Sequence, residues 1–230
     1  MAGRYLGCAA GLALFLVVAP AVRAQGSVED YTATDPKKLG VEPVLPAKDA
    51  KTGFVVAGKN PTALIAKLTE IAGRSIDDLE DDMRPGGLST AGFLGKDERL
   101  LDVLAADNRY VVDDLGLTHQ QIARHLLVLG AIAGKASGAG TKEIAYHGRR
   151  FKVKATHHRN FITSPFKDGT RTNGVIQVDN LASGKTVTYS LLVPLMIERY
   201  GFYEGKGTPY RVEPSAIVEV LDFLKPAKQP

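Results

Sequence analysis

Residues 141–153 read TKEIAYHGRRFKV, and this stretch decides the fold. Apolar and polar side chains alternate on both sides of His147-Gly148, which is the pattern of two half-buried strands joined by a two-residue turn. The pairing places Ile144 opposite Phe151. One face of the predicted hairpin is therefore apolar, so other elements must cover it.

Two more strands are predicted after the hairpin, over residues 175–180 and 186–193. In the second, apolar side chains occupy every other position from Val187 onward, which indicates a strand that is covered on one face and wet on the other. Pro194 then suits the start of a short helix to Tyr200. A last helix is expected to open near Ser215, which precedes a further apolar stripe.

Helices are predicted before the sheet. Asn60-Pro61 is expected to start the first helix, which the stripe of apolar residues extends to Gly73. Ser75 is expected to cap a second, short helix. A third is expected over 97–106.

The clearest predicted helix covers residues 119–133. Thr118 and Gln121 form a capping box at its start, because each side chain can bond the backbone N–H of the other residue. A glycine-rich stretch over 134–140 then marks the change from helical to strand periodicity.

This order of elements predicts the fold class. Helices grouped first and strands grouped second favour an α+β fold, with an N-terminal group of helices packed on a mainly antiparallel sheet and a C-terminal helix. We expect a single domain over residues 59–230, helical over 59–134 and β-rich over 143–230.

The N-terminus has the pattern of a secretory signal peptide over residues 1–24. Arg4 precedes an apolar run that starts at Leu6, and small residues lead to a cleavage point after Ala24. An uncleaved anchor would need about 20 apolar residues, and Pro20 interrupts this run. We therefore expect a chain exported to a periplasm or to the cell exterior, with no transmembrane segment after cleavage.

Cleavage decides the cysteine chemistry, because Cys8 is the only cysteine in the chain. The mature chain would then hold no disulfide, no thiolate nucleophile and no cysteine-ligated zinc. Lys and Arg number 29 against 25 Asp and Glu, and this near balance predicts no nucleic-acid partner.

The segment 25–58 shows neither helical nor strand periodicity, and it carries Pro36, Pro43 and Pro46. We expect it to be extended or partly disordered. Its one apolar patch, residues 53–58, would either add an edge strand or tuck against the core.

One predicted strand has a basic face. Arg150, Lys152, Lys154 and His158 alternate with apolar residues, so they point to the same side. An anionic glycan, peptide or protein could dock there. The alternative is an ordinary wet strand face that keeps the sheet soluble.

A glycine-rich segment over residues 198–211 gathers aromatic side chains. Tyr200, Tyr203 and Tyr210, with Arg211, are candidates for lining a groove that binds a sugar or a peptide. The alternative is that the rings close the end of the core.

Metal, nucleotide and DNA-binding patterns fail on their spacing. His119 and His125 diverge around a helix, and the acidic run over 77–82 lacks the glycine of an EF-hand. Asp179 stands where a phosphate-binding loop needs its first glycine, and Leu127 stands where a helix-turn-helix would turn. We predict no cofactor and no metal.

These observations favour an exported, cofactor-free binding or structural module over an enzyme. The main alternative is a metal-independent hydrolase or lyase acting on an envelope or extracellular polymer. Its acid and base would come from His157, His158, Tyr200, Tyr210 or acidic pairs. A third hypothesis is an interaction protein attached to the envelope through residues 25–58.

Overall fold

The computed structural model describes residues 28–48, 55–136 and 140–225, so the predicted signal peptide lies outside the described residues. Its main sheet has five strands in the order β1-β4-β5-β6-β7. Their bounds are β1 Glu29–Asp30, β4 Thr141–Tyr146, β5 Arg149–Thr163, β6 Arg171–Asn180 and β7 Thr186–Ser190. All neighbours pair antiparallel except β1, which runs parallel to β4.

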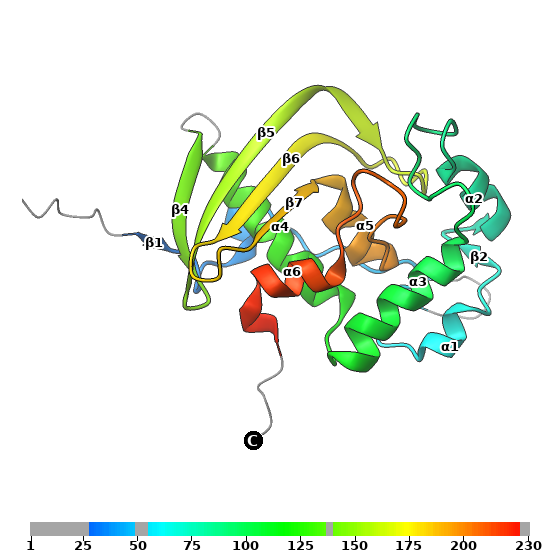
Figure 1. Cartoon of the computed structure of the whole chain (residues 1–230), viewed down its shortest axis with the longest axis horizontal. Coiled ribbons are helices and arrows are strands. Elements are labelled where there is room, and N and C mark those ends of the chain that lie inside the picture. The colour runs from blue at the N-terminus through cyan, green and yellow to red at the C-terminus, as the bar shows by residue number, and fades with distance from the viewer. Residues whose placement is uncertain (1–27, 49–54, 137–139, 226–230) are drawn as a thin grey trace, which may run out of the picture.

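Helices pack on this sheet and gather at one end of it. Their bounds are α1 Thr62–Ile65, α2 Ile76–Met83, α3 Leu100–Asn108, α4 His119–Lys135, α5 Leu192–Tyr200 and α6 Pro214–Val220. β5 and β6 run side by side as a long arch, and α1, α2 and α3 are grouped beyond the end at which β5 finishes (Figure 1). α4 contacts β5, β6 and α5, and α6 contacts β6 and β7. The predicted α+β class with a C-terminal helix is confirmed.

The predicted hairpin around His147-Gly148 forms as expected. Ile144 lies opposite Phe151, and His147 and Gly148 both adopt positive φ, as a tight two-residue turn requires. Ile144 and Phe151 have no exposed surface. The alternation of side chains along the two strands therefore reports their buried face correctly.

The capping box is also confirmed. The Thr118 hydroxyl accepts a hydrogen bond from the backbone N–H of Gln121, and the Gln121 side chain accepts one from the backbone N–H of Thr118. The helix it opens, α4, runs to Lys135. Ser75 likewise caps α2 through the backbone N–H of Asp78.

The predicted helix from Asn60 to Gly73 is wrong beyond its first turn. α1 ends at Ile65, and a small hairpin follows, formed by β2 (Glu70–Ile71) and β3 (Arg74–Ser75). Ala72 and Gly73 between these strands have φ of 53° and 74°. Two successive residues with positive φ make a tight turn. The chain therefore forms this hairpin and does not continue as a helix, for which the apolar stripe was only a weak signal.

Element boundaries also differ from the prediction in two other regions. β7 stops at Ser190 and α5 begins at Leu192, so the strand is shorter than expected and the helix starts before Pro194. α3 begins at Leu100 and continues through Asn108 into a π-helix over Arg109–Asp114.

The N-terminal segment takes part in the fold. Tyr31 and Val41 are buried, and so are Val56 and Ala57. A 3₁₀ helix covers Pro36–Leu39, and an isolated β-bridge joins Lys48 to Val55. Tyr31, Val41 and Val56 belong to a hydrophobic core that extends through both halves of the chain. A second 3₁₀ helix covers Asp222–Leu224.

Within the described ranges, no helix has the length and apolar character that crossing a membrane would require.

Candidate functional site

The candidate site lies at an irregularity in the pairing of β5 with β6. His157 pairs with Gly174 and Ile162 pairs with Thr172, so β5 advances five residues while β6 advances two. Extra residues in one strand of a pair form a bulge, which redirects side chains and often lies beside functional sites. The residues from His158 to Phe161 make up this bulge.

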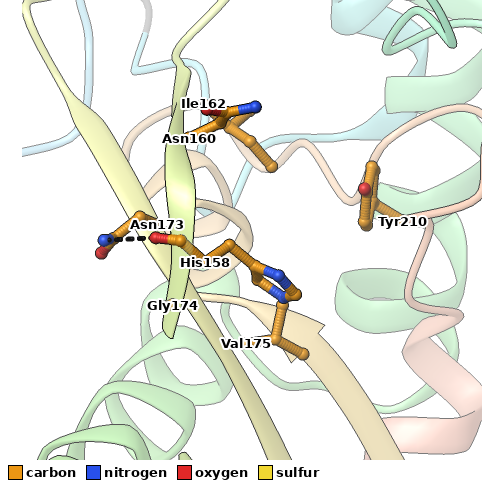
Figure 2. A pocket seen from close by; sticks show the side chains of 7 residues that line it. All are labelled: His158, Asn160, Ile162, Asn173, Gly174, Val175 and Tyr210. Carbon is orange, nitrogen blue, oxygen red and sulfur yellow. Dashed lines mark hydrogen bonds between the residues drawn. The ribbon is translucent and has the colours of Figure 1, made fainter. Parts of the chain in front are cut away.

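A pocket with a volume of about 230 Å³ lies at the bulge. Figure 2 shows the imidazole of His158 pointing toward Val175, with the ring of Tyr210 on the opposite side of the space. The side-chain amide of Asn173 donates a hydrogen bond of 2.9 Å to the carbonyl oxygen of His158. The full lining is His158, Asn160, Ile162, Asn173, Gly174, Val175 and Tyr210, none of which is acidic.

Tyr210 is presented to the pocket by a loop that is anchored at the next residue. The Arg211 guanidinium donates two hydrogen bonds to the carboxylate of Asp107, at 2.7 and 3.1 Å, and two to the carboxylate of Glu213, at 2.7 and 2.9 Å. It also donates to the carbonyl oxygen of Glu204. Burial raises the pKa of Asp107, and its hydrogen bonds with Arg211 offset part of that effect.

The other tyrosines of the predicted aromatic groove lie in the core. Tyr200 stacks on Phe166 with ring centroids 3.7 Å apart, and its hydroxyl donates to Asp168 at 3.0 Å. Tyr203 has no exposed surface, and its hydroxyl lies 3.1 Å from Nδ1 of His119. Tyr210, by contrast, is 44% exposed. The aromatic segment thus divides into rings that pack the core and one ring that faces the pocket.

The predicted basic face divides in a similar way. Near the hairpin turn, Arg150 forms an ion pair of 2.9 Å with Glu143. Lys152 lies between Glu143 and Asp179 in the strand register. Lys154 lies opposite Gln177, which carries no charge. The first half of the basic row is therefore partly neutralised by acidic neighbours, whereas the half toward His158 is not.

More cations extend this second half. Lys154, Arg159 and Arg171 are exposed, and they form no ion pair with the residues that the structure describes. The Arg171 guanidinium lies 5.1 Å from the ring centroid of Phe161, itself 56% exposed. The nearby acidic residue, Asp168, is already paired with Arg199 at 2.6 Å. This end of the β5–β6 arch is therefore a cationic surface beside the pocket.

A buried polar chain lies elsewhere, between α3, α4 and the loop after α5. Nε2 of His119 lies 3.3 Å from Oδ1 of Asn108, whose amide donates to the carbonyl of Asn60 and to Thr62. Because that amide fixes Oδ1 as an acceptor, we assign the proton of His119 to Nε2, and Nδ1 accepts from the Tyr203 hydroxyl. Burial lowers the pKa of His119 to about 4. Each side chain in this row of hydrogen bonds therefore has its partners, so the row is a packing element of the core.

A second histidine cluster surrounds the hairpin turn. Nδ1 of His125 lies 2.8 Å from the Tyr146 hydroxyl, and His147 stacks on Phe223 with centroids 4.7 Å apart. Burial, aided by His147, lowers the pKa of His125 to about 4. Across the described ranges, no three His, Cys, Asp or Glu side chains gather in a metal-binding arrangement.

Sequence reasoning named His158 and Tyr210 as candidates, and the structure brings these two to one pocket. Asn160, Asn173 and Arg171 were not predicted from the sequence. Asn160 and Asn173 join His158 in lining the pocket because the bulge shifts the register of the two strands, and Arg171 contacts Phe161 in the bulge.

Comparison with protein-family models, with curated proteins and with solved structures gives no match for this chain. The pocket must therefore be interpreted from its own chemistry.

Proposed function

We propose that this chain is an exported, cofactor-free binding module that takes an anionic ligand in the pocket between His158 and Tyr210. The observation that carries the proposal is the position of this pocket at the bulge, where Arg159 and Arg171 form no ion pair with the described residues; Lys154, which also forms none, lies further along β5. A concave, largely apolar site with a few polar groups is the usual form of a ligand site. Cations without partners favour an anionic ligand and attract it from a distance.

The alternative of a hydrolase or lyase receives less support. General acid–base chemistry needs two proton-transferring groups within hydrogen-bond reach of the reacting atoms. The pocket holds an imidazole and a phenol, but no carboxylate lines it and no hydrogen bond joins His158 to Tyr210. Tyr200, another candidate for this chemistry, is buried and bonded to Asp168. Turnover of a glycan, peptide or ester by the purified chain would overturn the proposal.

Binding can be tested without assuming the class of the ligand. The purified chain is applied to an array of acidic and neutral glycans and peptides of matched length. We expect it to retain acidic members, and the double variant Arg159→Gln/Arg171→Gln to lose them. The matched control is Arg149→Gln/Arg150→Gln, which removes the same charge from β5 where both residues have acidic partners. Equal loss in both double variants would contradict a site at the bulge.

Export is supported by the N-terminal pattern alone and needs its own test. The full chain is expressed in a bacterial host, and the soluble protein outside the cytoplasm is subjected to N-terminal sequencing. Our proposal requires that its first residue be Gln25. Retention of the uncut chain in the cytoplasm would refute export and leave the binding proposal standing.

A further inference from the structure

We infer that the ligand of this pocket is an acidic oligosaccharide, one of whose sugar rings lies against Tyr210 while its anionic groups meet the cations of the bulge. The inference rests on the proposed function, since it names the ligand class of the same site. Three properties of the site support it: the size of the pocket, the character of its walls and the distribution of charge around it.

Size sets the first limit. Pockets for compact drug-sized ligands have volumes of about 300–1,000 Å³. The volume of about 230 Å³ lies below that range. The pocket therefore holds one ring-sized portion of a ligand, and a longer ligand must continue over the surface beside it.

The walls present an aromatic face and short apolar groups. The Tyr210 ring stands on one side, and Val175 and Ile162 contribute apolar surface on the strands (Figure 2). A ring that offers C–H groups on its faces and polar groups at its edge fits such a space, because the faces pack on the aromatic ring while the edge remains available for hydrogen bonds. A pyranose has this character.

The polar groups of the pocket suit hydroxyls. Asn160 supplies an amide, which both donates and accepts, and His158 adds an imidazole. Figure 2 shows the amide of Asn173 on the other side of the strand from Tyr210, where it donates to the carbonyl of His158. Sugar hydroxyls also donate and accept, so they match an amide better than a carboxylate side chain of a peptide, which only accepts.

The charges lie outside the pocket and not within it. Arg159 sits between two residues that line the pocket, His158 and Asn160, and Arg171 pairs with Thr163, next to Ile162. Lys154 lies further along β5. Lys154 and Arg159 are five positions apart on β5, and Arg171 lies on the neighbouring strand β6, so these cations are spread along the arch. A row of spread cations suits repeated anionic groups on a linear ligand better than a single charge.

The test uses isothermal titration calorimetry on the purified chain with two acidic oligosaccharides, an oligogalacturonate tetrasaccharide and a heparin-derived tetrasaccharide, and with tetraglutamate as an acidic peptide for comparison. We expect at least one of the two oligosaccharides to bind, and the neutral methyl ester of the first probe to bind roughly tenfold more weakly or not at all. Tyr210→Ala should weaken binding by roughly tenfold or more, whereas Tyr210→Phe should stay within about twofold, because the ring face makes the contact.

The outcomes separate the two proposals. If tetraglutamate binds and neither acidic oligosaccharide does, the ligand class is overturned and the binding function stands. If an acidic oligosaccharide binds equally well to Tyr210→Ala and to Arg159→Gln/Arg171→Gln, the site is overturned. If none of the anionic probes or array members binds, the proposed function falls as well.

Discussion

Arg211, in the loop after α5, and Asp107, near the end of α3, form a two-point ion pair whose side chains are only 5% and 4% exposed. The pair joins residues 104 positions apart in the chain. It fixes the backbone at Arg211, and the neighbouring residue Tyr210 is thereby held at the edge of the pocket. Arg211 of the buried ion pair and Tyr210 of the proposed ligand contact are adjacent in sequence. Loss of the ion pair should therefore also weaken ligand binding.

Asp107→Asn should therefore affect both stability and binding. The substitution leaves the buried guanidinium with only the half-exposed Glu213 as a counter-charge, and breaking a buried ion pair costs up to about 3–5 kcal/mol of unfolding free energy. Urea denaturation measures this loss, and calorimetry at a temperature where the variant remains folded should show weaker ligand binding. Glu213 is half exposed and serves as the control. Glu213→Gln should cost less than about 1 kcal/mol, and a similar cost in both variants would contradict the role given to Asp107.

Glu204→Gln should stabilise the protein at alkaline pH. Glu204 is 1% exposed, and burial raises its pKa from 4.5 to about 8. A carboxyl that is protonated when folded and ionised when unfolded makes stability fall as pH rises between these values, by up to about 1.4 kcal/mol per pH unit. Glutamine is neutral at all pH values and keeps an acceptor for the Thr208 hydroxyl.

The measurement is urea denaturation from pH 4.5 to 8.5. We expect the unfolding free energies of the two proteins to be closest near pH 4.5 and to diverge in favour of Glu204→Gln as pH rises. Glu143→Gln, at an exposed position, should not change the pH profile in this way. Parallel profiles for wild type and Glu204→Gln would show that the folded carboxyl ionises normally.

His119 should make the fold sensitive to acid. Its pKa is about 4 when buried and 6.5 in an ordinary setting, so the unfolded chain binds the proton more tightly. Stability is then complete above pH 6.5 and falls as the pH drops toward 4, by up to about 1.4 kcal/mol per unit for this group. His119→Gln should be less stable at pH 7 but show a shallower acid slope. The exposed His157 is the control, since His157→Gln should leave the slope unchanged.

Salt should weaken ligand binding through the cations at the bulge. Raising NaCl from about 0.1 M to about 1 M shortens the screening length from about 10 Å to about 3 Å. Affinity for an acidic tetrasaccharide should fall by roughly tenfold over this range, and the fall should be smaller in Arg171→Gln. Arg150→Gln, whose parent side chain is paired with Glu143, should keep the wild-type salt dependence.

Deletion of the N-terminal segment should destabilise the domain instead of only releasing it from an attachment. A chain that starts at residue 59 lacks β1 and the buried side chains of Tyr31, Val41 and Val56. Burial of one such side chain stabilises by about 1.5–3 kcal/mol, so several kcal/mol are lost. A thermal melt compares the two chains. An unchanged melting temperature would support the hypothesis that this segment serves only for attachment.

The sequence by itself determined the features that depend on local periodicity and local hydrogen bonds. The alternation around His147-Gly148 predicted the hairpin and its register, and Thr118 with Gln121 predicted the start of α4. Such features are readable because their partners lie within a few residues. The same local reasoning failed at residues 66–73, where a weak helical stripe competed with two adjacent residues that adopt positive φ.

Only the tertiary structure decided which candidates pack in the core and which border the pocket. Tyr203 and Tyr210 lie in the same glycine-rich segment, yet the hydroxyl of the first bonds His119 inside the core and the second borders the pocket. Burial depends on contacts between distant segments, and no local pattern encodes it. The bulge in β5 that gathers Asn160 and Asn173 around His158 is likewise a property of two paired strands, because register exists only once both strands are in place.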